Sequence, residues 1–219
     1  MGARTTDRGL ESRVPKSFQE FLDPPRTALI MWDFQKGLAG RASHPGPMLA
    51  AAKQLLAAAD AAGVFVIWSR HILPPLDILP GPWLLWLMKK QGVDRVEDLK
   101  PAFQAGTEET AFLPGFEPSA GHLVLEKSQP SLFFDTPLDS RLKVLGVRTI
   151  VIAGFATDIG VEFTARHASA AGYFSIIAED ATGSHTLEAH ERSLVFLRGW
   201  VQVAKTSKIT EAWLGANAS

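Results

Sequence analysis

The stretch Thr27-Ala-Leu-Ile-Met-Trp-Asp33 holds the pattern that decides the fold. Its residues from Ala28 to Trp32 are continuously apolar, and the run ends at the carboxylate of Asp33. A short apolar run without polar alternation is typical of a strand that is buried on both faces of a parallel sheet, here Thr27–Trp32. We interpret four further segments in the same way: Val64–Trp68, His122–Leu125, Thr149–Ala153 and Tyr173–Ala178.

Helical patterns lie between these strands, over Met48–Ala62, Leu138–Leu145 and Val161–Ala171. A glycine directly follows each pattern, where a left-handed cap at a helix C-terminus favours this residue. These glycines are Gly63, Gly146 and Gly172. The alternation predicts an α/β fold: a doubly wound, mostly parallel sheet with helices on both faces, in a Rossmann-like arrangement of three layers.

The chain has 219 residues, of which 46% are hydrophobic, so that one domain with a substantial core is expected. We divide it into an N-terminal arm, residues 1–25, and one domain, residues 26–219. The arm is expected to form a short helix around Ser17–Leu22 that ends before the prolines at 24 and 25.

The connection over residues 71–121, here called the insertion, does not fit the regular alternation because it is rich in proline and tryptophan. Long insertions in compact α/β domains are usually lids, binding loops or oligomer contacts, although a plain surface helix over the sheet edge is an equal alternative. Its apolar face at Trp83, Trp86 and Leu87 could form the wall of a substrate pocket. Core packing or a subunit interface is the more common use of such a stripe.

The chain carries 22 basic and 23 acidic residues, a formal net charge of −1, and therefore lacks the basic surplus typical of nucleic-acid binding. No apolar run approaches the roughly 20 residues that cross a bilayer, and the polar N-terminus does not resemble a signal peptide. We expect a cytoplasmic protein with a small-molecule partner and no membrane or nucleic-acid partner. The chain has no cysteine, which excludes thiol catalysis.

Charged residues come at the ends of two predicted strands, where open parallel sheets bind their ligands. Asp33 follows the first strand and Lys127 follows His122–Leu125 closely, while the turn Gly154–Gly160 offers backbone amides to an anion. Each feature alone is more simply explained as a helix cap, a solvated charge or a turn. Together they predict a site for proton transfer, because nearby opposite charges tune each other's pKa.

These residues also carry a resemblance to the isochorismatase-like, or cysteine hydrolase, superfamily. The similar segments are Ala28-Leu-Ile-Met-Trp-Asp33-Phe-Gln35, Val124-Leu-Glu-Lys127, Ser131-Leu-Phe133, Thr136-Pro-Leu138 and Gly154-Phe-Ala-Thr-Asp158-Ile-Gly160-Val-Glu162-Phe-Thr-Ala-Arg166-His-Ala168. The resemblance covers about residues 26–206 and leaves the insertion poorly matched.

The resemblance implies an Asp-Lys-Cys catalytic triad, of which Asp33 and Lys127 supply the first two members. Gly160 stands at the position of the nucleophilic cysteine. The resemblance also implies a cis peptide between Phe155 and Ala156, and an oxyanion hole made of the backbone amides of Ala156 and Gly160.

Three explanations of Gly160 stay open. In the isochorismatase branch a glycine occupies this position, and an aspartate protonates an enol ether that water then attacks. The second explanation is a cysteine-type amide or carbamate hydrolase whose nucleophile was replaced, naturally or by engineering. The third is a binding or scaffold protein that retains the fold. We favour an active hydrolase that works without cysteine.

The resemblance implies further site properties. We expect Gln35, His71, Trp83 and Phe155 to contact the substrate, and, since relatives are frequently oligomeric, we expect a homo-oligomer. We expect no cofactor and no metal, because neither His44 nor His71 has a carboxylate at the spacing of the metal-binding relatives.

Overall fold

A computed structural model of the protein describes residues 13–215. Its centre is a six-stranded sheet in the order β3-β2-β1-β4-β5-β6, with every neighbouring pair parallel. The strands are β1 (Thr27–Trp32), β2 (Phe65–His71), β3 (Leu123–Lys127), β4 (Thr149–Phe155), β5 (Phe174–Gly183) and β6 (Gln202–Ala204). The doubly wound α/β architecture expected from the sequence is therefore confirmed.

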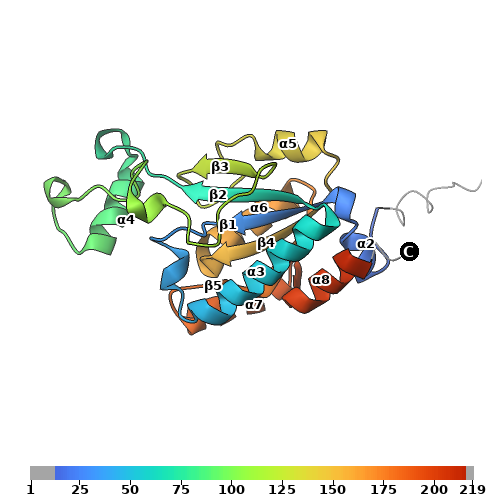
Figure 1. The fold of residues 1–219 in the computed structure, drawn as a ribbon. Coiled ribbons are helices and arrows are strands. Elements are labelled where there is room, and N and C mark those ends of the chain that lie inside the picture. The colour runs from blue at the N-terminus through green and yellow to red at the C-terminus, as the bar shows by residue number, and fades with distance from the viewer. Residues whose placement is uncertain (1–12, 216–219) are drawn as a thin grey trace, which may run out of the picture.

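Helices cover both faces of this sheet (Figure 1). The helices of the described chain are α2 (Phe18–Phe21), α3 (Pro45–Ala62), α4 (Gly81–Gln91), α5 (Leu138–Val144), α6 (Glu162–Ala170), α7 (Leu187–Arg198) and α8 (Thr206–Gly215), of which α4 lies in the insertion. Helices α3 and α8 pack together on one face, and α5, α6 and α7 pack on the other. Short 3-10 turns lie at Pro24–Arg26, Ala39–Arg41, Leu76–Ile78, Val96–Asp98 and Glu108–Thr110.

Strand β1 joins the two cores, as its fully buried sequence predicts. Leu29 and Met31 point into the core under α3 and α8, whereas Ala28, Ile30 and Trp32 point into the core under α5, α6 and α7. This alternation follows from the period of two along a strand. Trp32 therefore faces the layer of α5, α6 and α7, and this placement brings it to the site described below.

The strand boundaries differ from the expected ones at their carboxyl ends. Strands β2, β4 and β5 continue to His71, Phe155 and Gly183, beyond the apolar runs that predicted them. Lys127 is the last residue of β3 and lies opposite His71 of β2, rather than following its strand. Polar residues extend β2 and β5, whereas Gly154 and Phe155 extend β4. All these residues lie at the carboxyl edge of the sheet, where ligands bind in doubly wound folds.

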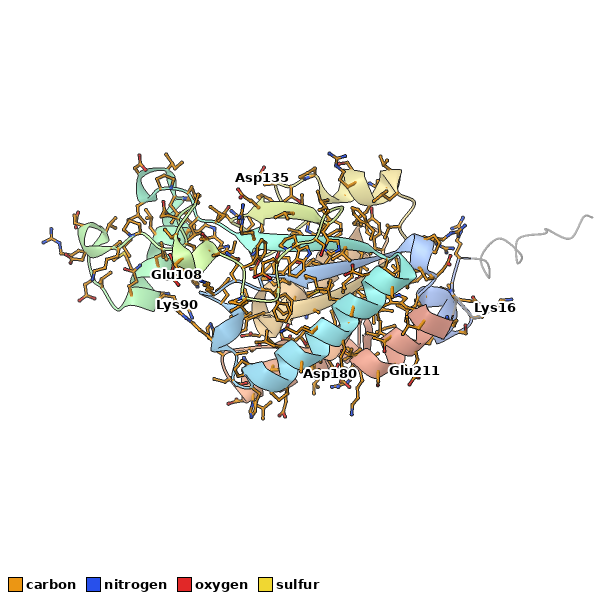
Figure 2. The ribbon with its side chains drawn as sticks, in the orientation of Figure 1. Lys16, Lys90, Glu108, Asp135, Asp180 and Glu211 are labelled. Carbon is orange, nitrogen blue, oxygen red and sulfur yellow. The ribbon has the colours of Figure 1, made fainter. Side chains whose placement is uncertain are left out.

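The described part of the arm, residues 13–25, and the insertion lie at opposite ends of the molecule. Figure 2 shows Lys90, on α4, far from Lys16, which precedes α2. Within the described part of the arm, Leu22 is fully buried in the core of α3 and α8. The insertion has a small core of its own, formed by Leu73, Leu79, Leu87 and Leu99. In residues 13–215 no helix is long and apolar enough to cross a membrane.

Candidate active site

A pocket of about 510 Å³ opens at the carboxyl ends of the central strands. Ligands bind at this edge in doubly wound sheets because the chain crosses from one face to the other there. The pocket brings together most of the residues singled out from the sequence: Asp33, His71, Trp83, Lys127, Phe155, Ala156 and Gly160. Gln35 is not among the lining residues.

Asp33 is held at the pocket floor in a left-handed backbone conformation, with φ of 50°. This conformation is costly for a residue other than glycine and persists only where its surroundings fix it. Ser69 on β2 provides that support: its hydroxyl accepts the Asp33 N–H at 3.0 Å and donates to Asp33 Oδ1 at 2.5 Å. The carboxylate is thus aimed by the neighbouring strand.

Lys127 completes a buried ion pair, since its Nζ donates to Asp33 Oδ2 at 2.6 Å. The two side chains are 4% and 5% exposed, so the pair is shielded from solvent. Burial lowers the pKa of Lys127 from its ordinary value, and the charge of Asp33 offsets this only in part. The pair is therefore suited to exchanging a proton, because neither of its members is stabilised by bulk water.

Gly160 leaves no room for a side chain. It lies in the π-helical turn Thr157–Val161, which joins β4 to α6, whereas the sequence predicted a turn that ends at Gly160 and a helix from Val161. A Cβ atom at Gly160 would lie 2.1 Å from Nε1, 2.3 Å from Cε2 and 2.4 Å from Cζ2 of Trp32. The indole ring thus occupies the space that any side chain at position 160 would need.

The segment before this turn has the backbone form implied by the resemblance. The peptide between Phe155 and Ala156 is cis, and both residues line the pocket. Phe155 also packs edge-on against His185, with ring centroids 4.8 Å apart. The backbone of Ala156 and of Gly160 therefore borders the same space as Asp33 and Lys127.

Gln35 supports the site from behind the pocket lining. Its Oε1 accepts the His71 N–H at 2.7 Å, and its Nε2 donates to the carbonyl oxygens of His71 and Thr110, both at 3.1 Å. The side chain is fully buried and its amide is engaged by backbone groups. This geometry gives Gln35 a positioning role, in place of the substrate contact expected from the sequence.

His71 presents its ring to the pocket, packed against Phe103 with centroids 5.1 Å apart. Its Nδ1 is buried and has no hydrogen-bond partner among residues 13–215. Burial, and then the nearby charge of Lys127, hold the pKa of His71 well below the ordinary value of 6.5. The ring is therefore neutral at physiological pH.

The outer wall of the pocket comes from α4 and the loops of the insertion. Trp83, Trp86 and Leu87 line it, and the two indole rings pack edge-to-face with centroids 5.4 Å apart. The rim carries three further side chains with basic groups, Arg41, Lys90 and His185. The pocket thus combines an ionic floor with an aromatic wall.

Several lining or supporting residues were not singled out from the sequence as site residues, namely Trp32, Ser69 and Phe103. Ser69 gave a signal, since it is the first hydroxyl after a strand-like apolar run and lies at the end where ligands bind. The sequence contains no signal for Trp32, because an aromatic residue inside an apolar run is typical of the hydrophobic core. Among residues 13–215 no three His, Asp or Glu side chains lie together in a way that could hold a metal ion.

Comparison with known proteins places this geometry in a family. The model of the isochorismatase domain matches residues 27–208. Ureidoacrylate amidohydrolase RutB of Methylorubrum extorquens is 32% identical over 198 residues, which cover 82% of this chain and 80% of that protein. The RutB protein of Pantoea ananatis is 30% identical over 225 residues, covering 90% of this chain and 88% of its own.

Solved structures share the fold at lower identity. A cysteine hydrolase from Pseudomonas syringae pv. phaseolicola superposes with a TM-score of 0.78 at 23% identity, covering 88% of this chain and 94% of that one. Nicotinamidase PncA from Bacillus subtilis gives a TM-score of 0.68 at 22% identity, covering 82% and 99%. Since the family model spans most of the sequence, the chain belongs to the isochorismatase family of hydrolases.

Proposed function

We propose that this protein hydrolyses a small molecule with water as the nucleophile and with Asp33 and Lys127 as its acid–base pair. The observation that carries the proposal is the buried 2.6 Å ion pair at the floor of a pocket whose Gly160 has no space for a nucleophilic side chain. Acid–base residues can act alone on substrates that need protonation before water attacks.

Hydrolysis of an enol ether fits this arrangement best. The pair gives its proton, through Asp33, to the vinyl carbon, and the ether oxygen stabilises the resulting cation. Water adds to the cation, and the hemiketal collapses to a carbonyl compound and an alcohol. The proton released by water returns to the pair, so that every atom and charge is accounted for.

The remaining lining residues would bind the substrate. The aromatic side chains of Trp83 and Phe155 suit a flat or apolar group, and the neutral ring of His71 adds a further uncharged surface to the pocket. Gly160 and Ala156 would contribute backbone amides to any oxygen that gains negative charge.

Hydrolysis of an amide or carbamate is the second candidate, because the similar RutB proteins are named ureidoacrylate amidohydrolases. Here Asp33 would remove a proton from water as the water attacks the carbonyl carbon. The tight contact between Gly160 and Trp32 argues against a simple loss of cysteine, since a thiol would not fit beside the indole ring as it lies.

A hydrolysis screen separates these reactions from mere binding. We would incubate the protein with enol ethers, amides, carbamates and esters in ¹⁸O-labelled water and follow the products by mass spectrometry, with Asp33→Asn as the matched control. Turnover of enol ethers by the parent alone supports the first reaction, and turnover of amides or carbamates supports the second. Binding without turnover in every class would leave a binding or scaffold protein.

Two properties of the whole protein are also proposed, namely a cytoplasmic location and a homo-oligomeric state. Exposed Phe163, Phe196 and Trp200 on or beside α6 and α7 support self-association, because exposed apolar side chains often mark interfaces. Light scattering on the eluting peak of a sizing column tests the oligomer, and a monomer at micromolar concentration would contradict it.

A further inference from the structure

Trp32 is seated between two glycines that match its shape. It pairs with Gly154 across β1 and β4, where a Cβ atom would lie 2.0 Å from the Trp32 carbonyl oxygen and 2.8 Å from its Cβ. On the pocket side, a Cβ at Gly160 would overlap the indole ring. Both positions therefore need glycine for the same reason, which is the placement of one tryptophan.

The indole ring also forms part of the ionic floor. Lys127 Nζ lies 4.3 Å from the ring centroid while donating to Asp33. A cation over an aromatic face is attracted to it, and more so where water is excluded. Trp32 therefore helps to fix the ammonium group that completes the acid–base pair.

The Nε1 atom of this indole lies beside Gly160, which also lines the pocket. Trp32 is 1% exposed, yet it lines the cavity. Its Nε1 has no hydrogen-bond partner among residues 13–215. Nε1 of Trp213 also has none, but that atom is sealed, which means that it is fully buried, and Trp32 Nε1 is not among the atoms of this kind. The single side-chain donor of Trp32 therefore lies at the spot where a side chain of residue 160 would begin.

We propose that the Trp32 side chain fills the space in which a cysteine at position 160 would lie, and that its indole N–H donates a hydrogen bond to an oxygen atom of the bound substrate. The ring thereby excludes catalysis by a thiol at this position. The inference deepens the proposed function and rests on it for the identity of the reaction. This hydrogen bond favours two classes of substrate. In an enol ether, the ether oxygen would accept it, close to the vinyl carbon that is protonated. In an amide or carbamate, the carbonyl oxygen would accept it, next to the carbon that water attacks.

The seating of Trp32 is tested without any substrate by a cycle of Gly160→Cys, Trp32→Ala and the double variant. Since the chain has no cysteine, the introduced thiol is the sole target for iodoacetamide. We expect each single change to lower the melting temperature, and the double variant to be more stable than the sum of the two losses predicts. The thiol should also react faster in the double variant. Additive losses with equal labelling rates would overturn the proposed exclusion.

The donor is tested by hydrogen exchange at indole N–H groups in protein labelled with ¹⁵N-tryptophan, assigned with Trp→Phe variants. Trp68, whose Nε1 donates to His122 at 3.0 Å, and Trp213, whose Nε1 is sealed, serve as internal controls. We expect the Trp32 proton to exchange at least tenfold faster than both. An equally protected Trp32 proton would show that it does not face the pocket and would overturn the proposed hydrogen bond.

Kinetics then connect the donor to the reaction. With a substrate from the screen, Trp32→Phe keeps an aromatic ring but removes the N–H, and kcat/KM should fall about tenfold to a hundredfold. An unchanged kcat/KM in a folded Trp32→Phe protein overturns the proposed hydrogen bond. A different result would separate the two proposals. If the Trp32 indole proton exchanges fast and the losses in the mutant cycle are not additive, but no substrate in the screen is turned over, the proposed reaction is rejected and the placement of Trp32 stands.

Discussion

The floor of the pocket comes from the ends of parallel strands, whereas its outer wall comes from the insertion. Asp33, Ser69 and Lys127 form hydrogen bonds across β1, β2 and β3, and all three are buried. On the wall, Trp83 is only partly buried and Trp86 is 36% exposed. If the proposed function holds, residues of the sheet carry out the chemistry, and we expect the insertion to set substrate preference, because a loop segment can vary without disturbing the sheet.

Removing the acid of the floor should have the largest effect. Asp33→Asn keeps the shape of the side chain and can still bond to Ser69, but it cannot accept or deliver a proton as a carboxylate does. We expect kcat/KM for a substrate from the screen to fall about 100-fold to 10,000-fold, the usual contribution of general acid–base catalysis. Circular dichroism should show an unchanged fold, and parental turnover would refute the assignment.

Separating the ion pair should come second, with an effect on stability as well. Lys127→Met leaves the Asp33 carboxylate buried without its counter-charge, and breaking a buried pair typically costs about 3–5 kcal/mol. We therefore expect a lower free energy of unfolding in urea at pH 7. The double variant Asp33→Asn/Lys127→Met is the control and should recover much of the loss, because no lone charge remains buried. Equal losses in the single and double variants would mean that the pair is not coupled.

The contrast between floor and wall also marks how far the sequence could predict the site. Asp33 was found because a charge directly after a buried apolar run is costly unless it has a function or a partner. Lys127 was found because it comes at the carboxyl end of a predicted strand, where ligands of parallel sheets bind. For the wall, the sequence indicated the apolar face at Trp83, Trp86 and Leu87, and all three residues line the pocket. The pattern could not decide between a pocket wall, core packing and a subunit interface, because an apolar stripe is typical of all three. Strand β6, with three residues, is too short to give a periodic signal.

The role of Trp32 shows a different limit. Its apolar neighbours predicted burial correctly, and the resemblance drew attention to Gly160, but nothing in the sequence links the two residues. They meet because the last residue of β1 points toward the turn that follows β4, which is a consequence of strand order. Gln35 illustrates the same point, since its side chain bonds to the backbone of His71 on β2 and of Thr110 in the insertion.

His71 lies where floor and wall meet, and it should make stability sensitive to acid. Its folded-state pKa is well below 6.5, so as pH falls below about 6.5 the unfolded chain takes up a proton that the folded protein resists. Stability contributed by neutral His71 is thus present above this pH and is lost below it, by at most about 1.4 kcal/mol per pH unit.

The variant His71→Asn cannot titrate in this range and should flatten that dependence. We would compare urea unfolding of both proteins at pH 7.5, 6.5 and 5.5. The parent should lose more stability than the variant between the last two values. Parallel curves would mean that other groups cause the acid sensitivity.

Changes in the wall should have the smallest effect, and one confined to binding. Trp83→Ala removes an aromatic surface from the pocket but touches neither Asp33 nor Lys127, so we expect KM to rise about threefold to tenfold with kcat nearly unchanged. This corresponds to a loss of about 0.7–1.4 kcal/mol of binding free energy, which is the same for the bound substrate and for the transition state. Ile78→Ala provides the control, because this apolar side chain belongs to the same insertion, is 67% exposed and is not part of the pocket lining. A large fall in kcat for Trp83→Ala would show that the insertion takes part in the chemical step, and the division between a catalytic floor and a selective wall would then be wrong.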